Sequence, residues 1–381
     1  MAEDKLLLIP GPSPVVPRIL EALALPTVSH VGPDMVRDLA EACENLKRIV
    51  FCDNGEPFIV AGAGTLSMEM ALVNTAGAAD RVLVVSQGYF GDRMAQICRA
   101  FGIEHDVLEC EWGRAVTPGE LERRIKSRSY NVVVCTHVDT ATGACAPVEE
   151  YAQVLSRTGA IFIVDGVCAT GGIPERMDAW GIDVVLTAAQ KCLGTPPGLT
   201  LCVFSEAAME KRRGLASIPA YYSDILLWLP VMRDPAKYFS TPCVNEIRAF
   251  AEATRIVIEE GIEERFERHE LYAGAVRAGL AALGFSFFTD PRFAAATLSV
   301  VRYPDGVEDK AFRAGLYARG VVVAGGLGPT AGRVFRMGHM GNLTSAQVRL
   351  AIDAVEATLA GLGRPVEAGS GRRAVDAVLK A

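Results

Sequence analysis

The sequence predicts an α/β fold with a mostly parallel sheet, and two observations carry this prediction. Seven short apolar runs follow one another between about residues 57 and 204, and polar or amphipathic stretches of helical length separate most of them. The runs are continuous in hydrophobicity rather than alternating. Buried strands joined by helical crossovers have this pattern, because both faces of a parallel sheet are covered.

The elements can be assigned in chain order. An extended, proline-rich segment comes first, and strands are then expected at 57–62, 81–86, 105–109, 131–137, 160–165, 183–188 and 200–205. Ligands of open α/β sheets bind outside the carboxyl ends of the strands. The candidate site therefore comprises the residues that follow these strands: Gly62–Thr65, Gln87–Gly91, His137–Thr142, Asp165–Val167 and Ala189–Lys191.

The pattern changes after residue 205. Long amphipathic helices are expected at 244–260 and 262–283, followed by strands near 295–303 and 320–326. A last helix is indicated by apolar residues at helical spacing from Val348 to Leu362, and Thr344 with Gln347 forms a capping box at its start. These features predict a smaller α+β domain at the C-terminal end.

A chain of 381 residues is too long for one ordinary core, so two main domains are expected. We expect an extended N-terminal arm over residues 1–20, a large α/β domain over 21–243 and a small α+β domain over 244–362. A glycine- and serine-containing break separates a tail over 363–381.

Composition excludes several classes of function. A net charge of −7 argues against a nucleic-acid surface and a polybasic membrane anchor, and no apolar run is long enough to span a bilayer. The N-terminus has neither signal-peptide nor transit-peptide features. The ten cysteines lack C-x-x-C spacing, which is typical of reduced thiols, and we expect a cytoplasmic protein. The five histidines show no metal-binding spacing, so no metal is expected.

Three features at strand ends carry candidate chemistry. The glycine-rich turn in VAGAGTLSMEM leads from a strand into a helix, a place that favours a phosphate, although it lacks the third glycine of a dinucleotide site. Asp165 ends a buried strand and needs a partner. Lys191 follows the next strand and precedes a glycine- and proline-rich loop. Alone, the turn and the lysine are more often structural, and the aspartate is as often structural as functional. Together they provide a phosphate cradle, a pyridinium partner and an imine-forming amine, as pyridoxal phosphate requires.

The chain resembles a known family over about residues 5–362. The motifs LLLIPGPSPVVPRI, AGAGTLSMEMALVN, QGYFGDR, CTHVDTATG, IVDGVCATGG, AAQKCLGTPPGLT, YFSTP and GGLGPTAGRVFRMGHMG stand in the family's order. They are similar to those of the class V, fold-type I pyridoxal-phosphate aminotransferases, closest to the alanine–glyoxylate and serine–pyruvate enzymes. The resemblance implies a large, mostly parallel seven-stranded sheet domain and a smaller C-terminal domain.

The resemblance also assigns roles around the cofactor ring. Lys191 matches the Schiff-base lysine, and Gln190 before it matches a phosphate ligand. Asp165 matches the acid that pairs with the pyridinium nitrogen. Val167 is implied to pack on one face of the ring, and Phe90 stands where the family has a stacking aromatic residue, usually tryptophan.

Further roles are implied at the phosphate and the substrate. Ala63, Gly64 and Thr65 fall at the phosphate turn, where family members often have serine in place of the alanine, and Thr140 matches a hydroxyl residue near the ring. Tyr238 and Thr241 match residues that reach the neighbouring subunit's phosphate, which implies a homodimer with active sites at its interface. Arg336 matches the arginine that binds the substrate carboxylate, a task suited to a planar bidentate group.

The resemblance implies transfer of an amino group from a small L-amino acid, alanine or serine, to glyoxylate or pyruvate. Aspartate, serine–glyoxylate, ureidoglycine, phosphonate-specific and pyridoxamine–pyruvate aminotransferases remain alternatives. The last of these carries an acid in the turn after the first strand, whereas this chain has AGAG there. A cysteine desulfurase needs a late catalytic cysteine, and no cysteine follows Cys243. A non-catalytic binding protein is the alternative from a different class, but it would be expected to lack the lysine or the aspartate.

Overall fold

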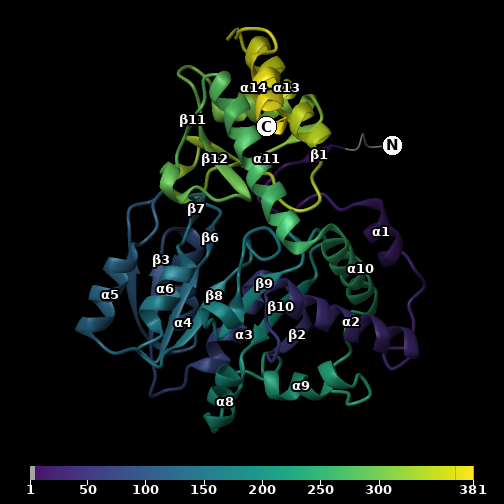
Figure 1. The fold of residues 1–381 in the computed structure, drawn as a ribbon, viewed down its shortest axis with the longest axis vertical. Coiled ribbons are helices and arrows are strands. Elements are labelled where there is room, and N and C mark those ends of the chain that lie inside the picture. Colours follow the sequence, from purple (N-terminus) through teal and green to yellow (C-terminus); the bar gives the residue numbers. More distant parts are fainter. Residues whose placement is uncertain (1–4, 365, 381) are drawn as a thin grey trace.

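The computed structural model describes residues 5–364 and 366–380. Figure 1 shows a large domain, in the lower part of the view, and a small domain above it. The long helix α11 (Ile262–Ala282) leads from the one to the other. The α/β architecture predicted from the sequence is confirmed.

The large domain is built on a seven-stranded sheet of strand order β2-β10-β9-β8-β5-β3-β4. Only β10 runs antiparallel to its neighbours, so the sheet is mostly parallel, as predicted. Every residue of the central strands β5, β8 and β9 is buried, which explains their continuous apolar sequences. The strands are β2 (Glu56–Ala61), β3 (Arg81–Ser86), β4 (Glu104–Glu109), β5 (Val132–Thr136), β8 (Ile161–Asp165), β9 (Val184–Ala188) and β10 (Leu199–Phe204).

Helices connect the strands and cover the sheet (Figure 1). A short hairpin, β6 (Val138–Asp139) and β7 (Ala144–Cys145), follows β5. The helices of this part are α2 (Pro33–Ile49), α3 (Gly64–Thr75), α4 (Tyr89–Ala100), α5 (Pro118–Ser127), α6 (Val148–Leu155), α7 (Met177–Trp180), α8 (Glu206–Gly214), α9 (Ile225–Arg233) and α10 (Val244–Glu260).

The small domain has a four-stranded antiparallel sheet of order β11-β12-β15-β14. The capping box predicted at Thr344 and Gln347 is present at the start of α13. The elements after α11 are β11 (Ser286–Phe287), η1 (Pro291–Phe293), β12 (Leu298–Arg302), α12 (Asp309–Ala318), β13 (Val321–Val322), β14 (Ala324–Gly325), η2 (Gly328–Thr330), β15 (Val334–Gly338), α13 (Ser345–Gly361) and α14 (Ser370–Leu379).

The expected domain boundaries stay a prediction. The packing of two helices shows which core each of them joins. Buried side chains of α10, among them Ile247 and Phe250, belong to the core of the large sheet, although the sequence grouped this helix with the small domain. In the tail, α14 packs against α11 and α13, and Val375 is fully buried in the small domain's core. Helix α14 was not expected from the sequence, because its apolar face is only a few residues long.

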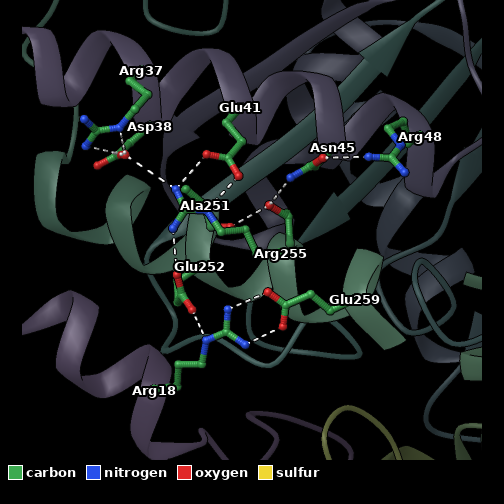
Figure 2. A network of polar contacts seen from close by, with 11 residues as sticks. Arg18, Arg37, Asp38, Glu41, Asn45, Arg48, Ala251, Glu252, Arg255 and Glu259 are labelled. Carbon is green, nitrogen blue, oxygen red and sulfur yellow. Dashed lines mark hydrogen bonds and ion pairs between the residues drawn. The ribbon is translucent and has the colours of Figure 1, made fainter. Parts of the chain in front are cut away.

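The N-terminal arm contacts both domains. Strand β1 (Leu6–Leu7) pairs with β13 of the small domain, and α1 (Pro17–Leu23) packs on α10. Figure 2 shows the polar network at the second contact: Arg18 on α1 binds Glu259 through two hydrogen bonds of 2.5 and 2.8 Å. On the other side of α10, Arg255 binds Glu41 of α2 at 2.6 and 2.7 Å. The arm is therefore fixed at both ends.

Candidate active site

The carboxyl ends of the strands bring the predicted residues to one cavity of about 180 Å³. Of the residues predicted from the sequence, eight line it: Ala63, Gly64, Thr65, Phe90, Asp165, Val167, Gln190 and Lys191. They come from the ends of β2, β3, β8 and β9, which lie at the same edge because these strands are parallel to one another.

One end of the cavity is the start of α3. Gly64 and Thr65 are the first two residues of this helix, so their N–H groups have no acceptor within it, and its N-cap Ala63 supplies no side-chain cap. The amide oxygen Oε1 of Gln190 is buried without a partner among the described residues, and as an acceptor it calls for a donor rather than for an anion. Unpaired donors at a helix N-terminus form an anion site, and a phosphate fits it.

Gly64 stands in a tight space. A Cβ atom at this position would lie 3.2 Å from Cγ2 of Val167 and 3.3 Å from Cβ of Ala188. The absence of a side chain therefore lets the backbone of the turn approach the strand ends closely. A ligand that binds the N–H groups of the turn can therefore also lie close to the strand ends.

Asp165 is a buried carboxylate in need of a cation. Its Oδ1 accepts a hydrogen bond from the Val167 N–H at 3.1 Å, and its Oδ2 accepts one from the Thr136 hydroxyl at 3.4 Å. No lysine or arginine forms an ion pair with it in the described ranges. Burial consequently raises its pKa to about 7. A protonated ring nitrogen would supply the missing positive charge.

Lys191 enters the cavity from the loop after β9. Its Nζ donates a hydrogen bond to the carbonyl oxygen of Pro10, with the two atoms 2.5 Å apart. The loop itself turns back through a hydrogen bond from the Gly194 N–H to the Lys191 carbonyl oxygen at 3.0 Å. The amine is thus held in the same cavity as the anion site and the buried carboxylate.

Phe90 and Val167 provide apolar surface in the cavity. The Phe90 N–H donates to Oδ2 of the buried Asp139 at 2.7 Å, which fixes the start of α4. The guanidinium of Arg93 lies over the Phe90 ring, 4.7 Å from its centre. Two apolar groups of this kind suit the faces of a flat aromatic ligand.

Four predicted residues lie outside the cavity lining: Thr140, Arg336, Tyr238 and Thr241. The structure brings the first two together, since Nη1 of Arg336 donates to the Thr140 carbonyl oxygen at 3.2 Å and its Nε donates to that of Gly325 at 2.8 Å. Tyr238 is 60% exposed, and its hydroxyl lies 3.3 Å from that of Thr241. Their predicted role concerns a neighbouring subunit.

Four residues that line the cavity were not expected from the sequence: Met68, Arg93, Thr136 and Cys168. Arg93 belongs to the QGYFGDR motif, and its position one helical turn after Phe90 is a signal that was available. Thr136 ends β5 one residue before the range chosen from the sequence. The contact of Pro10 with Lys191 could not be read from the sequence, because it is made by the backbone carbonyl group and not by a side chain.

The described part of the chain also bears on metal sites, membrane spans and disulfides. There, no group of histidine, cysteine and acidic residues is placed to hold a metal ion. No described helix combines the length and the apolar character needed to cross a membrane. All ten cysteines are free thiols.

Comparison with known proteins identifies the family. The family model for class V aminotransferases matches residues 19–346, most of the chain. The chain belongs to the class V aminotransferases. Two relatives agree with this assignment. An uncharacterized aminotransferase of Methanocaldococcus jannaschii is 37% identical over all of this chain and 99% of its own length. The L-aspartate–glyoxylate aminotransferase of Paracoccus denitrificans is 32% identical over 97% of this chain and 95% of its own length.

Solved structures of class V aminotransferases have the same fold. The ureidoglycine–glyoxylate aminotransferase of Bacillus subtilis matches with a TM-score of 0.95 and 29% identity, covering 99% of this chain and 98% of the other. The alanine–glyoxylate aminotransferase of a Nostoc species matches with a TM-score of 0.91 and 30% identity, covering 94% of this chain and 96% of the other. The pyridoxamine–pyruvate aminotransferase of Mesorhizobium loti matches with a TM-score of 0.93 and 29% identity, covering 100% of this chain and 98% of the other.

The chain is therefore a pyridoxal-phosphate-dependent aminotransferase of fold type I, as the sequence predicted. The cavity fits this cofactor on its own evidence. It combines an uncapped helix N-terminus for the phosphate, a buried carboxylate without a cation for the ring nitrogen and a lysine amine.

Proposed function

We propose that this aminotransferase moves the amino group of a small L-amino acid, alanine or serine, to glyoxylate or pyruvate. One observation carries the proposal: Lys191, Asp165 and the uncapped start of α3 line a single cavity, with Arg336 held near the hairpin that follows β5. The first three suit the cofactor, and the arginine suits the carboxylate common to amino acids and 2-oxo acids.

Lys191 has two tasks in this proposal. Pyridoxal phosphate, when bound, supplies an aldehyde that can accept an amino group and a ring that withdraws electrons from the donor's Cα atom. Nζ of Lys191 anchors the cofactor covalently. When it is free, the same amine would take the proton from the donor's Cα atom.

The other residues hold charge and orientation. Asp165 keeps a proton on the ring nitrogen by pairing its negative charge with it, and the N–H groups of Gly64 and Thr65 hold the phosphate. Phe90 and Val167 pack on the ring. Arg336 binds the substrate carboxylate with the edge of its guanidinium that Thr140 and Gly325 leave free, and so aligns the Cα–H bond with Lys191.

Glyoxylate is the favoured acceptor, because relatives and solved structures named for three different donors are all named for glyoxylate as well. These relatives act on aspartate, ureidoglycine and alanine. A pyridoxamine–pyruvate activity is less well supported, because the turn at Ala63 carries no acid and its N–H groups are arranged for a phosphate.

An aspartate donor is the second candidate, and Arg93 favours it. Its side chain lines the cavity and forms no ion pair with an acidic residue in the described ranges; its polar contact is with the Thr65 hydroxyl at 3.3 Å. A free arginine beside the ring suits a second carboxylate. The L-aspartate–glyoxylate relative is consistent with this alternative.

We also propose a cytoplasmic homodimer. Tyr238 and Thr241 are exposed side chains whose hydroxyl groups lie next to each other, and neither lines the cavity of its own chain. Exposed aromatic and hydroxyl groups of this kind suit a partner's phosphate. The free thiols suit a reducing compartment.

A donor panel tests the proposal. The protein loaded with pyridoxal phosphate is incubated with glyoxylate and one of L-alanine, L-serine or L-aspartate, and glycine is measured by mass spectrometry. The proposal predicts the highest kcat/KM with alanine or serine. A preference for aspartate that the Arg93→Gln variant loses would establish the second candidate instead. Failure of all three donors to form glycine would contradict both candidates with glyoxylate as the acceptor.

A further inference from the structure

The N-terminal segment 6–13, here called the strap, contacts Lys191. Among the described residues, the hydrogen bond of the lysine amine is to the backbone of this segment and not to a side chain of the cavity. The Pro10 carbonyl oxygen accepts the hydrogen bond of Lys191 Nζ. Gly11 lies directly against the same side chain, because a Cβ atom built on it would be 2.4 Å from Nζ and 2.3 Å from Cδ. Its φ of +106° also favours glycine. A side chain at position 11 would therefore require the end of the lysine side chain to move from this position.

Ser13 fixes the backbone of the lysine loop. Its N–H donates to the Gln190 carbonyl oxygen at 3.0 Å, and its hydroxyl donates to that of Lys191 at 2.6 Å. Ser13 is buried, so both bonds are shielded from water. The strap therefore holds Lys191 at its backbone and at its amine.

The other end of the strap belongs to the small domain. The Leu8 N–H donates to the Val322 carbonyl oxygen, and the Gly338 N–H donates to that of Leu8, each at 2.8 Å. Gly338 ends β15, the strand that carries Arg336. One short segment thus joins the proposed carboxylate-binding strand to the lysine loop.

We propose that the strap positions Lys191 for the reaction, and this proposal rests on the function proposed above. The Pro10 carbonyl receives the lysine amine when it is not bonded to the cofactor, and Gly11 leaves the space for that position. Ser13 holds the lysine loop in place. Pro10, Gly11 and Ser13 act through Lys191, and so they are positioning residues.

The first test measures attachment of the cofactor to Lys191 directly. Cofactor-free protein is mixed with pyridoxal phosphate, reduced with borohydride at timed intervals, and the labelled Lys191 peptide is quantified by mass spectrometry. Gly11→Ala should label at least about tenfold more slowly than the wild type, because its Cβ overlaps the lysine. The matched control is Gly284→Ala, which also has a positive φ (+85°) but no atom within 4 Å of the added Cβ, and it should label as the wild type does.

A second pair of variants keeps the proposal testable if Gly11→Ala does not fold. Ser13→Ala should lower kcat about five- to tenfold, the factor for one hydrogen bond, with little change in KM, and Ser13→Thr should restore it by restoring the hydroxyl. Wild-type labelling in Gly11→Ala, or equal kcat in all Ser13 variants, would overturn the proposal. These outcomes differ from failure of the proposed function, in which the wild type would bind the cofactor at Lys191 but form no glycine.

Discussion

Arg336 is held against the hairpin that follows β5, because its Nη1 atom donates a hydrogen bond to the Thr140 carbonyl oxygen at 3.2 Å. A second bond, from Nε to the Gly325 carbonyl oxygen, fixes the plane of the guanidinium. A fixed plane can present its remaining edge to a carboxylate without further loss of side-chain freedom. The two residues predicted from separate motifs are therefore in contact, through the Thr140 backbone rather than its hydroxyl.

Arg336→Lys is expected to raise KM for the amino donor roughly 10- to 100-fold, because lysine keeps the charge but loses the planar fork and both backbone bonds. The effect on kcat should be smaller. Steady-state kinetics with saturating glyoxylate measures both. Arg333→Lys, an exposed position on the preceding turn, is the matched control and should leave KM unchanged.

Asp165 predicts a pH dependence of the cofactor-free protein. Burial raises its pKa from the ordinary 3.8 to about 7, so the folded state binds this proton more tightly than the unfolded state does. The associated stability is present below about pH 4 and is lost as the pH rises to about 7, by on the order of 4 kcal/mol at most. Asp165→Asn removes this loss.

Urea unfolding of the cofactor-free wild type and Asp165→Asn at pH 5 and pH 8 checks this prediction. The variant should gain stability relative to the wild type at the higher pH. Its rate of transamination should nevertheless fall about 100- to 1,000-fold, because an electrostatic partner of the reacting group is gone. Parallel pH profiles of the two proteins would refute the assignment of a buried, unpaired carboxyl.

Gly64→Ala is expected to weaken binding of pyridoxal phosphate about tenfold, since the added methyl group must displace Val167 or Ala188 beside the phosphate turn. Fluorescence titration of the cofactor-free protein gives the dissociation constant. Gly214→Ala, where no atom lies within 4 Å of the added Cβ, is the control and should bind as the wild type does.

The ion pairs in Figure 2 should contribute unequally to stability. Arg18 is half-exposed, so Arg18→Ala should cost less than about 1 kcal/mol of unfolding free energy. Arg255 is less exposed and binds Glu41 and Glu252 together, so Arg255→Ala should cost about 1–2 kcal/mol. Chemical denaturation in low and high salt checks both, and an equal cost for the two variants would contradict this ranking by exposure.

Much of the fold was predictable because its strands are continuous apolar runs. The edge of the sheet that carries Asp165 and Lys191 followed from the rule for strand ends. The direction of β10 was not predictable, because an antiparallel strand buried on both faces has the same composition as a parallel one. Helix α14 was missed because its docking depends on tertiary contacts of Val375.

The site divides in the same way. Side chains whose chemistry matters, such as Lys191 and Asp165, were visible in the sequence. The Pro10 carbonyl was not, because every residue has a carbonyl group and only the fold decides which one meets Lys191. Thr136 was missed because it is the last residue of β5, one position before the chosen range, and its hydroxyl acts through Asp165.

The central claim is that Lys191 and pyridoxal phosphate carry an amino group between two substrates. The most direct measurement is the visible spectrum of the loaded wild type and of Lys191→Ala, recorded as L-alanine and then glyoxylate are added. The yellow band of the wild type is expected to bleach with alanine and to return with glyoxylate, while the variant is expected to show no such cycle over many turnovers. A variant that cycles as fast as the wild type would contradict the account.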